Sequence, residues 1–180
     1  MSRAARAEPE EPSPDAAGDQ VAVAREIALR QLTVRQRTRA ELAQAMARRN
    51  VPEEAAQQVL DRFTEVGLLN DAGFARDWVA AGSRRQRGRR VLAAELAGKG
   101  VADELIEQAL AERSAEDELA SARELAGRRA ASLAGLDRQV RYRRLCGLLQ
   151  RRGFSWAVVA QVAREILDEN GDEALIEDET

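Results

Sequence analysis

The chain has 180 residues, of which none is histidine, one is cysteine and one is lysine, so it lacks the usual general base near neutral pH and cannot form an internal disulfide or a cysteine-rich metal site. Apolar residues make up 44% of the chain but aromatic residues only 3%, and the abundance of Ala, Leu, Arg, Glu and Gln predicts an all-α protein whose helices pack closely. The net charge of -3 hides an uneven distribution, because residues 21–167 contain 26 basic and 19 acidic residues, a net charge of +7. A basic body between acidic ends indicates a polyanion or an acidic protein surface as the partner.

The two ends of the chain have a different composition from the body. Residues 1–20 contain three prolines and few apolar side chains, so we expect a disordered acidic N-terminal extension. Residues 168–180 contain seven acids and no base, and we expect this acidic C-terminal tail to fray. No apolar run approaches the ~18 residues of a membrane span, and no hydrophobic signal region opens the chain. We therefore expect a cytoplasmic protein that does not bind membranes.

The body begins with a predicted unit of three helices. A first helix is expected over residues 21–32. Thr38 and Glu41 have the spacing of a capping box, which predicts the start of a second helix there. Pro52, followed by two glutamates, predicts the start of a third helix, which is expected to end near Gly67.

The pattern of this unit returns twice. Asn50, Gly100 and Gly153 each follow a basic residue, with apolar residues eight and four positions before them and an apolar residue immediately after. Glycine or asparagine suits the left-handed position at a helix end, and the basic neighbour complements the negative end of the helix dipole. The anchors are 50 and 53 residues apart, which predicts three tandem three-helix repeats, at residues 21–69, 70–113 and 114–167.

The second and third repeats have their own start signals. Asn70 or Asp71 can cap the first helix of the second repeat. Ser114 can cap the first helix of the third, which is expected to run to about Leu133. The last helix is expected over residues 155–167. Because each unit is small, neighbouring repeats must share apolar faces to be stable.

Arginine is concentrated at three places along the chain. Five arginines lie in residues 84–90, together with Gly88 and without an acid between them. A second set lies over residues 138–152, on the middle helix of the third repeat, and a smaller set precedes the matching helix of the first. In a regular array the three sets would align as a basic stripe. The residues predicted to form this surface are Arg84, Arg85, Arg87, Arg89, Arg90, Lys99, Arg141, Arg144, Arg151, Arg152, Arg35, Arg37 and Arg39.

The stripe has two interpretations. The arginines could bind phosphates or protein carboxylates, because the planar guanidinium makes bidentate contacts with both. Alternatively, they could be solvated helix ends in a protein that is rich in arginine. We favour binding, because no acid interrupts the run at residues 84–90.

Other conspicuous residues favour structural roles. Phe74, Trp78 and Trp156 could stack on bases, but their places on apolar helix faces predict core packing. Residues 116–118 are three adjacent acids that could hold a metal, yet at the start of a helix they more simply complement its dipole. Cys146 lies in an apolar register and is predicted to be a buried thiol. We expect no catalytic residue, no cofactor, no metal and no enzymatic activity.

The central repeat carries a specific series of residues, which are Asp71, Phe74, Ala75, Trp78, the arginine run with Gly88, Glu95, Leu96, Lys99 and Gly100. It resembles the RecX family, bacterial modulators of the RecA recombinase, specifically over this repeat and through the repeat architecture over residues 21–167. Asn50 replaces a common glycine and Trp78 a frequent tyrosine, and each suits the same role.

The resemblance implies degenerate helix-turn-helix-like units in an elongated, curved array. It also implies a negative regulator that binds the groove of the RecA–single-stranded-DNA filament and inhibits its ATPase, strand-exchange and co-protease activities, and so modulates DNA repair, recombination and the SOS response. The expected partners are the RecA nucleoprotein filament and single-stranded DNA, with weaker binding to duplex DNA, and we expect a monomer. The rival interpretation is a helix-turn-helix-like protein that acts directly on DNA; the apolar character of the third helices favours the filament binder.

Overall fold

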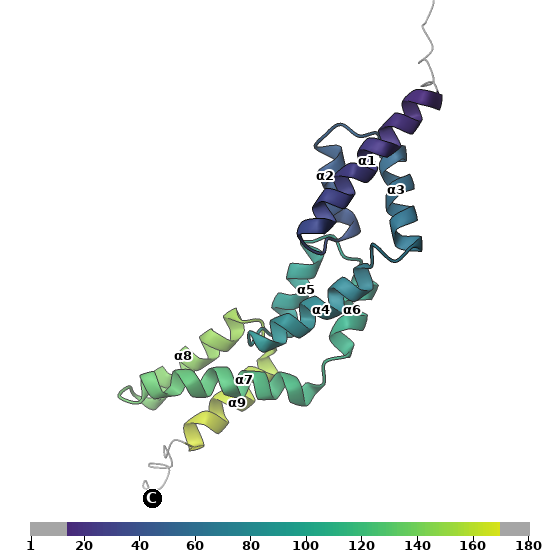
Figure 1. The fold of residues 1–180 in the computed structure, drawn as a ribbon. Helices are drawn as coiled ribbons and strands as arrows, with labels where there is room; N and C mark the ends of the chain where they lie inside the picture. Colours follow the sequence, from purple (N-terminus) through teal and green to yellow (C-terminus); the bar gives the residue numbers. More distant parts are fainter. Residues whose placement is uncertain (1–13, 170–180) are drawn as a thin grey trace, which may run out of the picture. The chain divides into compact units, whose positions relative to one another are not determined.

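The computed structural model describes residues 14–169, and within this range it contains helices and no strands (Figure 1). The prediction of an all-α protein is confirmed. No helix in this range combines the length and apolar character needed to cross a bilayer. The elements in chain order are α1 (Pro14–Val34), α2 (Arg39–Ala47), α3 (Glu53–Glu65), α4 (Asp71–Arg84), α5 (Arg89–Ala97), α6 (Asp103–Ala111), α7 (Ala115–Ala130), the 3-10 helix η1 (Ala131–Leu133), α8 (Arg138–Arg151) and α9 (Trp156–Glu169).

The first compact unit contains α1, α2 and α3, and α1 packs against both of the others (Figure 1). Leu42, Met46 and Leu60 are fully buried in its core. The predicted capping box opens α2: the Thr38 hydroxyl accepts a hydrogen bond from the Glu41 amide at 3.1 Å, and the Glu41 carboxylate accepts one from the Thr38 amide. Two backbone donors at the start of the helix are thereby satisfied.

The helix α1 begins at Pro14, earlier than the predicted start at residue 21. Residues 14–20 are therefore helical, and the expectation that they belong to a disordered extension is wrong. Proline is favoured in the first turn of a helix because its missing amide has no partner there anyway. The other residues of the expected extension, 1–13, and residues 170–180 of the expected tail lie outside the described range.

The second compact unit contains α4 to α9, and it has two separate cores. The helix α4 packs on α5 and α6 around Leu92 and Leu96, whereas α7 packs on α8 and α9 around Leu145 and Leu149. A smaller contact joins α4 to α7. Each predicted repeat thus has its own three helices and its own core, and the tandem repeat architecture is confirmed.

The three anchors close the middle helices in the same way. Asn50, Gly100 and Gly153 have φ angles of 57°, 72° and 88°. In each repeat the amide after the anchor donates to the carbonyl five residues earlier, at 3.2 Å: Val51 to Met46, Val101 to Leu96 and Phe154 to Leu149. All six of these side chains are buried. This is the Schellman arrangement, in which a left-handed residue lets the chain turn back and an apolar contact seals the helix end.

Candidate functional site

The arginine run spans the end of α4, a short loop and the start of α5. The loop turns sharply at Gln86, whose φ angle is 47°, and Gly88 is the N-cap residue of α5. This turn sends the five guanidinium groups in different directions. The run therefore divides into arginines that stabilise the fold and arginines that face solvent.

Arg87 and Arg89 make internal contacts. The Arg87 guanidinium lies 2.5 Å from the carboxylate of Glu95, which also accepts a hydrogen bond from the indole of Trp78. Arg89 donates to the carbonyls of Leu110 and of Arg113, at 2.6 Å and 2.8 Å, where α6 ends. These two guanidiniums bind acceptors of the second repeat, so they stabilise its fold.

Glu118 holds Arg89 from the third repeat. Its buried carboxylate lies 3.4 Å from the Arg89 Nε and accepts a hydrogen bond from the Arg89 amide at 3.2 Å. The acids at residues 116–118 lie in the first turn of α7, the position predicted for complementing its dipole. The predicted cap of this helix is confirmed at Ser114, whose hydroxyl accepts from the Asp117 amide. Within residues 14–169 these acids form no metal-binding cluster.

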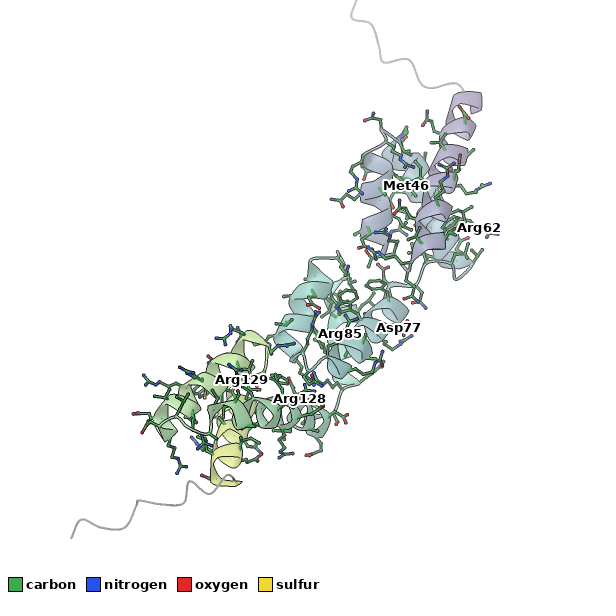
Figure 2. The ribbon with its side chains drawn as sticks, turned by 60° about the vertical axis from the view of Figure 1, so that its left-hand side comes forward. Met46, Arg62, Asp77, Arg85, Arg128 and Arg129 are labelled. Atoms are coloured by element: carbon green, nitrogen blue, oxygen red, sulfur yellow. The ribbon has the colours of Figure 1, made fainter. Side chains whose placement is uncertain are left out.

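Arg84, Arg85 and Arg90 are exposed, and none of them forms an ion pair within the described residues. Figure 2 shows Arg85 in the loop that follows α4. The outward charge of the run is thus three guanidiniums rather than five. A partner can pair with an arginine whose guanidinium has no ion pair within the protein, and these three arginines meet this condition.

A backbone contact joins this loop to the third repeat. The Gly88 amide donates to the carbonyl of Arg152 at 2.7 Å, and the Arg90 amide donates to the carbonyl of Gly153 at 3.1 Å. The Arg152 guanidinium in turn donates to the carbonyl of Arg85 at 3.2 Å. The arginine run at residues 84–90 and the predicted set of the third repeat therefore meet within the second unit. We call Arg85, Arg90 and Arg152, all exposed, the junction arginines.

Arg141 does not belong to this surface. It is only 6% exposed, so its prediction as a surface residue is wrong. The reason is helical spacing, because Arg141 lies four residues before Leu145 and eight before Leu149, on the ridge of α8 that faces the core. Arg144 and Arg151 are exposed, as predicted.

Arg144 and Arg151 line a groove of about 740 Å³ between α7 and α8, together with Arg129 and Arg143. Arg143 was part of the predicted basic set but not of the predicted interface, and Arg129 was in neither. A sequence signal for Arg129 exists, since Arg128 and Arg129 are adjacent at the end of α7 (Figure 2). What the sequence does not show is that this end lies beside α8.

The predicted basic residues of the first repeat are largely offset by acids. Arg35 pairs with Glu41 at 2.9 Å, and Arg39 pairs with Asp61 at 2.6 Å. Arg37 is half-buried. This set therefore presents less unneutralised charge than the junction arginines do.

Lys99 and the aromatic residues contribute to packing. The Lys99 ammonium lies 4.5 Å from the centre of the Trp78 ring, which stacks on Phe74. The predicted core role of Phe74 and Trp78 is confirmed, since the first is buried and the second packs on the core of the second repeat. For Trp156 the prediction is wrong: its side chain is 59% exposed because it is the first residue of α9, before the helix meets its neighbours.

Cys146 is buried in the core of the third repeat, as predicted. Burial raises the pKa of its thiol, because removal from water disfavours the thiolate. The reactive form of the side chain is therefore disfavoured at neutral pH.

Comparison with known families gives three matches along the chain. Models of the first, second and third three-helix domains of RecX match residues 24–63, 70–110 and 116–162. The regulatory protein RecX of Streptomyces coelicolor is 46% identical over 156 residues, covering 86% of this chain and 83% of that protein. The regulatory protein RecX of Thermobifida fusca is 45% identical over 156 residues, covering 86% of this chain and 84% of that protein.

Solved structures show the same fold. The crystal structure of RecX from Lactobacillus salivarius superimposes with a TM-score of 0.78 at 21% identity, covering 83% of this chain and 97% of that one. A second crystal structure, of a regulatory protein RecX, gives a TM-score of 0.76 at 21% identity, covering 86% of this chain and 80% of that one.

Proposed function

Because this chain belongs to the RecX family of regulatory proteins, we propose that it is a negative regulator of RecA that binds the groove of the RecA–single-stranded-DNA filament. Bound there, it lowers the ATPase, strand-exchange and co-protease activities of the filament, and so modulates DNA repair, recombination and the SOS response. It acts as a cytoplasmic monomer, without catalysis of its own.

The observation that best supports this proposal is the set of junction arginines. Arg85, Arg90 and Arg152 are exposed and form no ion pair within residues 14–169. Backbone hydrogen bonds at Arg90 and Arg152, and the bond from the Arg152 guanidinium to the Arg85 carbonyl, hold them together. Guanidiniums on an ordered backbone lose less conformational entropy when they bind carboxylates or phosphates than the same side chains would on a mobile loop. We assign the contact with the filament to these three residues, with Arg84, Arg144 and Arg151 at its margins.

The rival function, direct recognition of duplex DNA, is disfavoured by the third helix of each repeat. In a helix-turn-helix protein the recognition helix enters the major groove and meets phosphates on both sides. Here α3, α6 and α9 each contain more acidic than basic residues. Negative helices in that position would be repelled by DNA.

The test is single-stranded-DNA-dependent ATP hydrolysis by RecA, measured while the full-length chain is added. We expect inhibition well below one chain per RecA protomer. The double variant R85E/R90E should require a roughly tenfold higher concentration for half inhibition, as expected when charged contacts are reversed at an interface.

A matched control is R30E/R62E, which changes the net charge equally at two exposed arginines of the first unit that pair within their own helices. It should inhibit like the wild type. An equal loss in both variants would show that only overall charge matters. Tight duplex binding without any effect on ATP hydrolysis would favour the rival function.

A further inference from the structure

The groove between α7 and α8 lies in the third repeat. One wall is the end of α7 with Arg129, and the other is a strip along α8. The α8 residues of this strip recur every three or four positions, so they occupy one face of the helix for about three turns. They are Val140, Arg143, Arg144, Gly147, Leu148 and Arg151.

The charge of this groove is not neutralised. Arg129, Arg143, Arg144 and Arg151 are exposed, no acid lines the groove, and none of the four forms an ion pair within residues 14–169. Other arginines of the same helices behave differently: Arg128 pairs with Glu124 at 3.0 Å and Arg138 pairs with Asp168 at 2.7 Å. Four like charges around one hollow repel one another. Because they have no structural partner, the fold itself gains nothing from this arrangement.

Gly147 provides room at the centre of the strip. A Cβ there would come within 3.2 Å of the Arg151 Nη1. Glycine within a helix costs about 1 kcal/mol relative to alanine, so its presence in mid-helix is unfavourable for α8 alone. In the groove it leaves the floor open beside Val140 and Leu148 and lets the Arg151 guanidinium lie across the strip.

The arrangement fits a chain of phosphates better than a single anion. Four guanidiniums carry more positive charge than one phosphate can neutralise, and Arg144 and Arg151 start from positions about 10 Å apart along the axis of α8, so the groove can hold several phosphates of one strand. Guanidiniums bind phosphate oxygens bidentately and without reference to base identity. No aromatic or amide side chain lines the groove, so it lacks the aromatic platforms on which successive bases stack and the amides that read adenine.

We propose that the groove between α7 and α8 binds the phosphodiester backbone of a nucleic-acid strand without sequence preference. This proposal deepens the proposed function and rests on it, since it gives the regulator a hold of its own on the DNA of the filament. The strand runs along α8, where Arg143, Arg144 and Arg151 contact successive phosphates and Arg129 closes the groove from α7.

The test is the fluorescence anisotropy of a labelled single-stranded oligothymidine, titrated with the full-length chain at several salt concentrations. The variant R129Q/R143Q removes two groove charges. It should bind more weakly than the wild type, and the slope of log affinity against log salt should become shallower by about 1.4, at about 0.7 for each phosphate that the variant no longer binds. The control R128Q/R138Q removes equal charge from the same two helices outside the groove, and its slope should match the wild type.

Two outcomes would overturn the proposal. One is an unchanged affinity and slope in R129Q/R143Q, with circular dichroism showing that both variants are folded. The other is loss of binding to a polyglutamate peptide in R129Q/R143Q while binding to oligothymidine is unaffected, which would assign the groove to an acidic protein.

This measurement separates the two proposals. If the chain inhibits RecA while the groove variant binds oligothymidine normally, only the groove proposal fails. If the groove binds oligothymidine as expected while the chain leaves RecA ATP hydrolysis unchanged, only the proposed function fails.

Discussion

The backbones of Gly88 and Gly153 lie against each other with no space for a side chain at either residue. A Cβ on Gly88 would come within 2.3 Å of the Gly153 carbonyl carbon, and a Cβ on Gly153 would come within 2.5 Å of the Val91 amide nitrogen. This contact carries the hydrogen bonds that join the second repeat to the third and bring the junction arginines together. The glycine inside the arginine run is therefore needed for packing between repeats.

Substitution of Gly88 by alanine should separate this junction. The added methyl group meets backbone atoms that cannot move aside, so we expect a loss of about 1–3 kcal/mol in the free energy of unfolding, as for other overpacked sites. Urea denaturation of G88A measures it. The control is G135A, where a Cβ would meet nothing within 4 Å. Equal stability of the two variants would contradict the assigned role of the junction.

Arg89 and Arg90 are adjacent, but their substitution by glutamine should affect different properties. R89Q should lower the stability of the fold, whereas R90Q should weaken the inhibition of RecA. R89Q removes hydrogen bonds to the carbonyls at the end of α6 and the ion pair with the buried Glu118 carboxylate, so we expect a loss of about 1–3 kcal/mol in the free energy of unfolding. R90Q removes an exposed side chain and should change this free energy by less than about 0.5 kcal/mol.

The inhibition of RecA provides the second measurement on this pair. R90Q should weaken inhibition at a temperature where it is fully folded, because a junction arginine is removed. R89Q, once folded at lower temperature, should inhibit like the wild type. The reverse pattern would show that the inward and outward assignments of these residues are mistaken.

The three-helix repeats could be predicted because their signals are local. Asn50, Gly100 and Gly153 end their helices through contacts within six residues, and such contacts are visible in the order of residue types. The capping box at Thr38 is equally local. The direction of each arginine is not local: Arg89 turns inward because carbonyls of α6 and a carboxylate of α7 lie beside it, and their proximity follows only from the packing of helices.

The burial of Arg141 can be predicted from the sequence. Its spacing of four residues from Leu145 places it on the buried ridge of α8. Its charge suggests a surface position, but the long apolar stem of an arginine can lie along a core. Arg129 is the opposite case, because it joins Arg143 and Arg144 only through the contact between α7 and α8. The groove could therefore not be predicted from the spacing of arginines along the chain.

Substitutions of Asn50 test whether the left-handed backbone conformation determines which residue types occupy the three anchor positions. Its φ angle of 57° is strained for most residues but tolerated by asparagine and glycine. N50A should therefore lower the free energy of unfolding by about 1 kcal/mol, whereas N50G should keep or slightly raise it. Thermal unfolding of both variants gives the comparison. A stability of N50A equal to that of N50G would mean that the left-handed position is not what selects the residue here.

The ion pair between Arg123 of α7 and Glu165 of α9 predicts a pH dependence for the stability of the third repeat. The Arg123 Nε lies 2.8 Å from a Glu165 carboxylate oxygen. The hydrogen bond from Arg123, and then the one from Gln161, hold the pKa of Glu165 below its ordinary value of 4.5. The folded state thus favours the ionised carboxyl group, so the contribution to stability is present above pH 4.5 and is lost as the pH falls through the lower pKa of the folded state.

The substitution E165Q isolates this contribution. The wild type should be more stable than E165Q at neutral pH, and the difference should shrink below pH 4.5 and disappear once the carboxyl group is protonated in both the folded and unfolded states. Urea denaturation of both proteins from neutral pH to about pH 3 measures the difference, and the other acids, which titrate in both proteins, largely cancel from it. A difference that stays constant over this range would show that Glu165 contributes through packing or neutral hydrogen bonds. A difference that grows in acid would mean that the fold favours the protonated carboxyl group, and the assigned direction of the pKa shift would then be wrong.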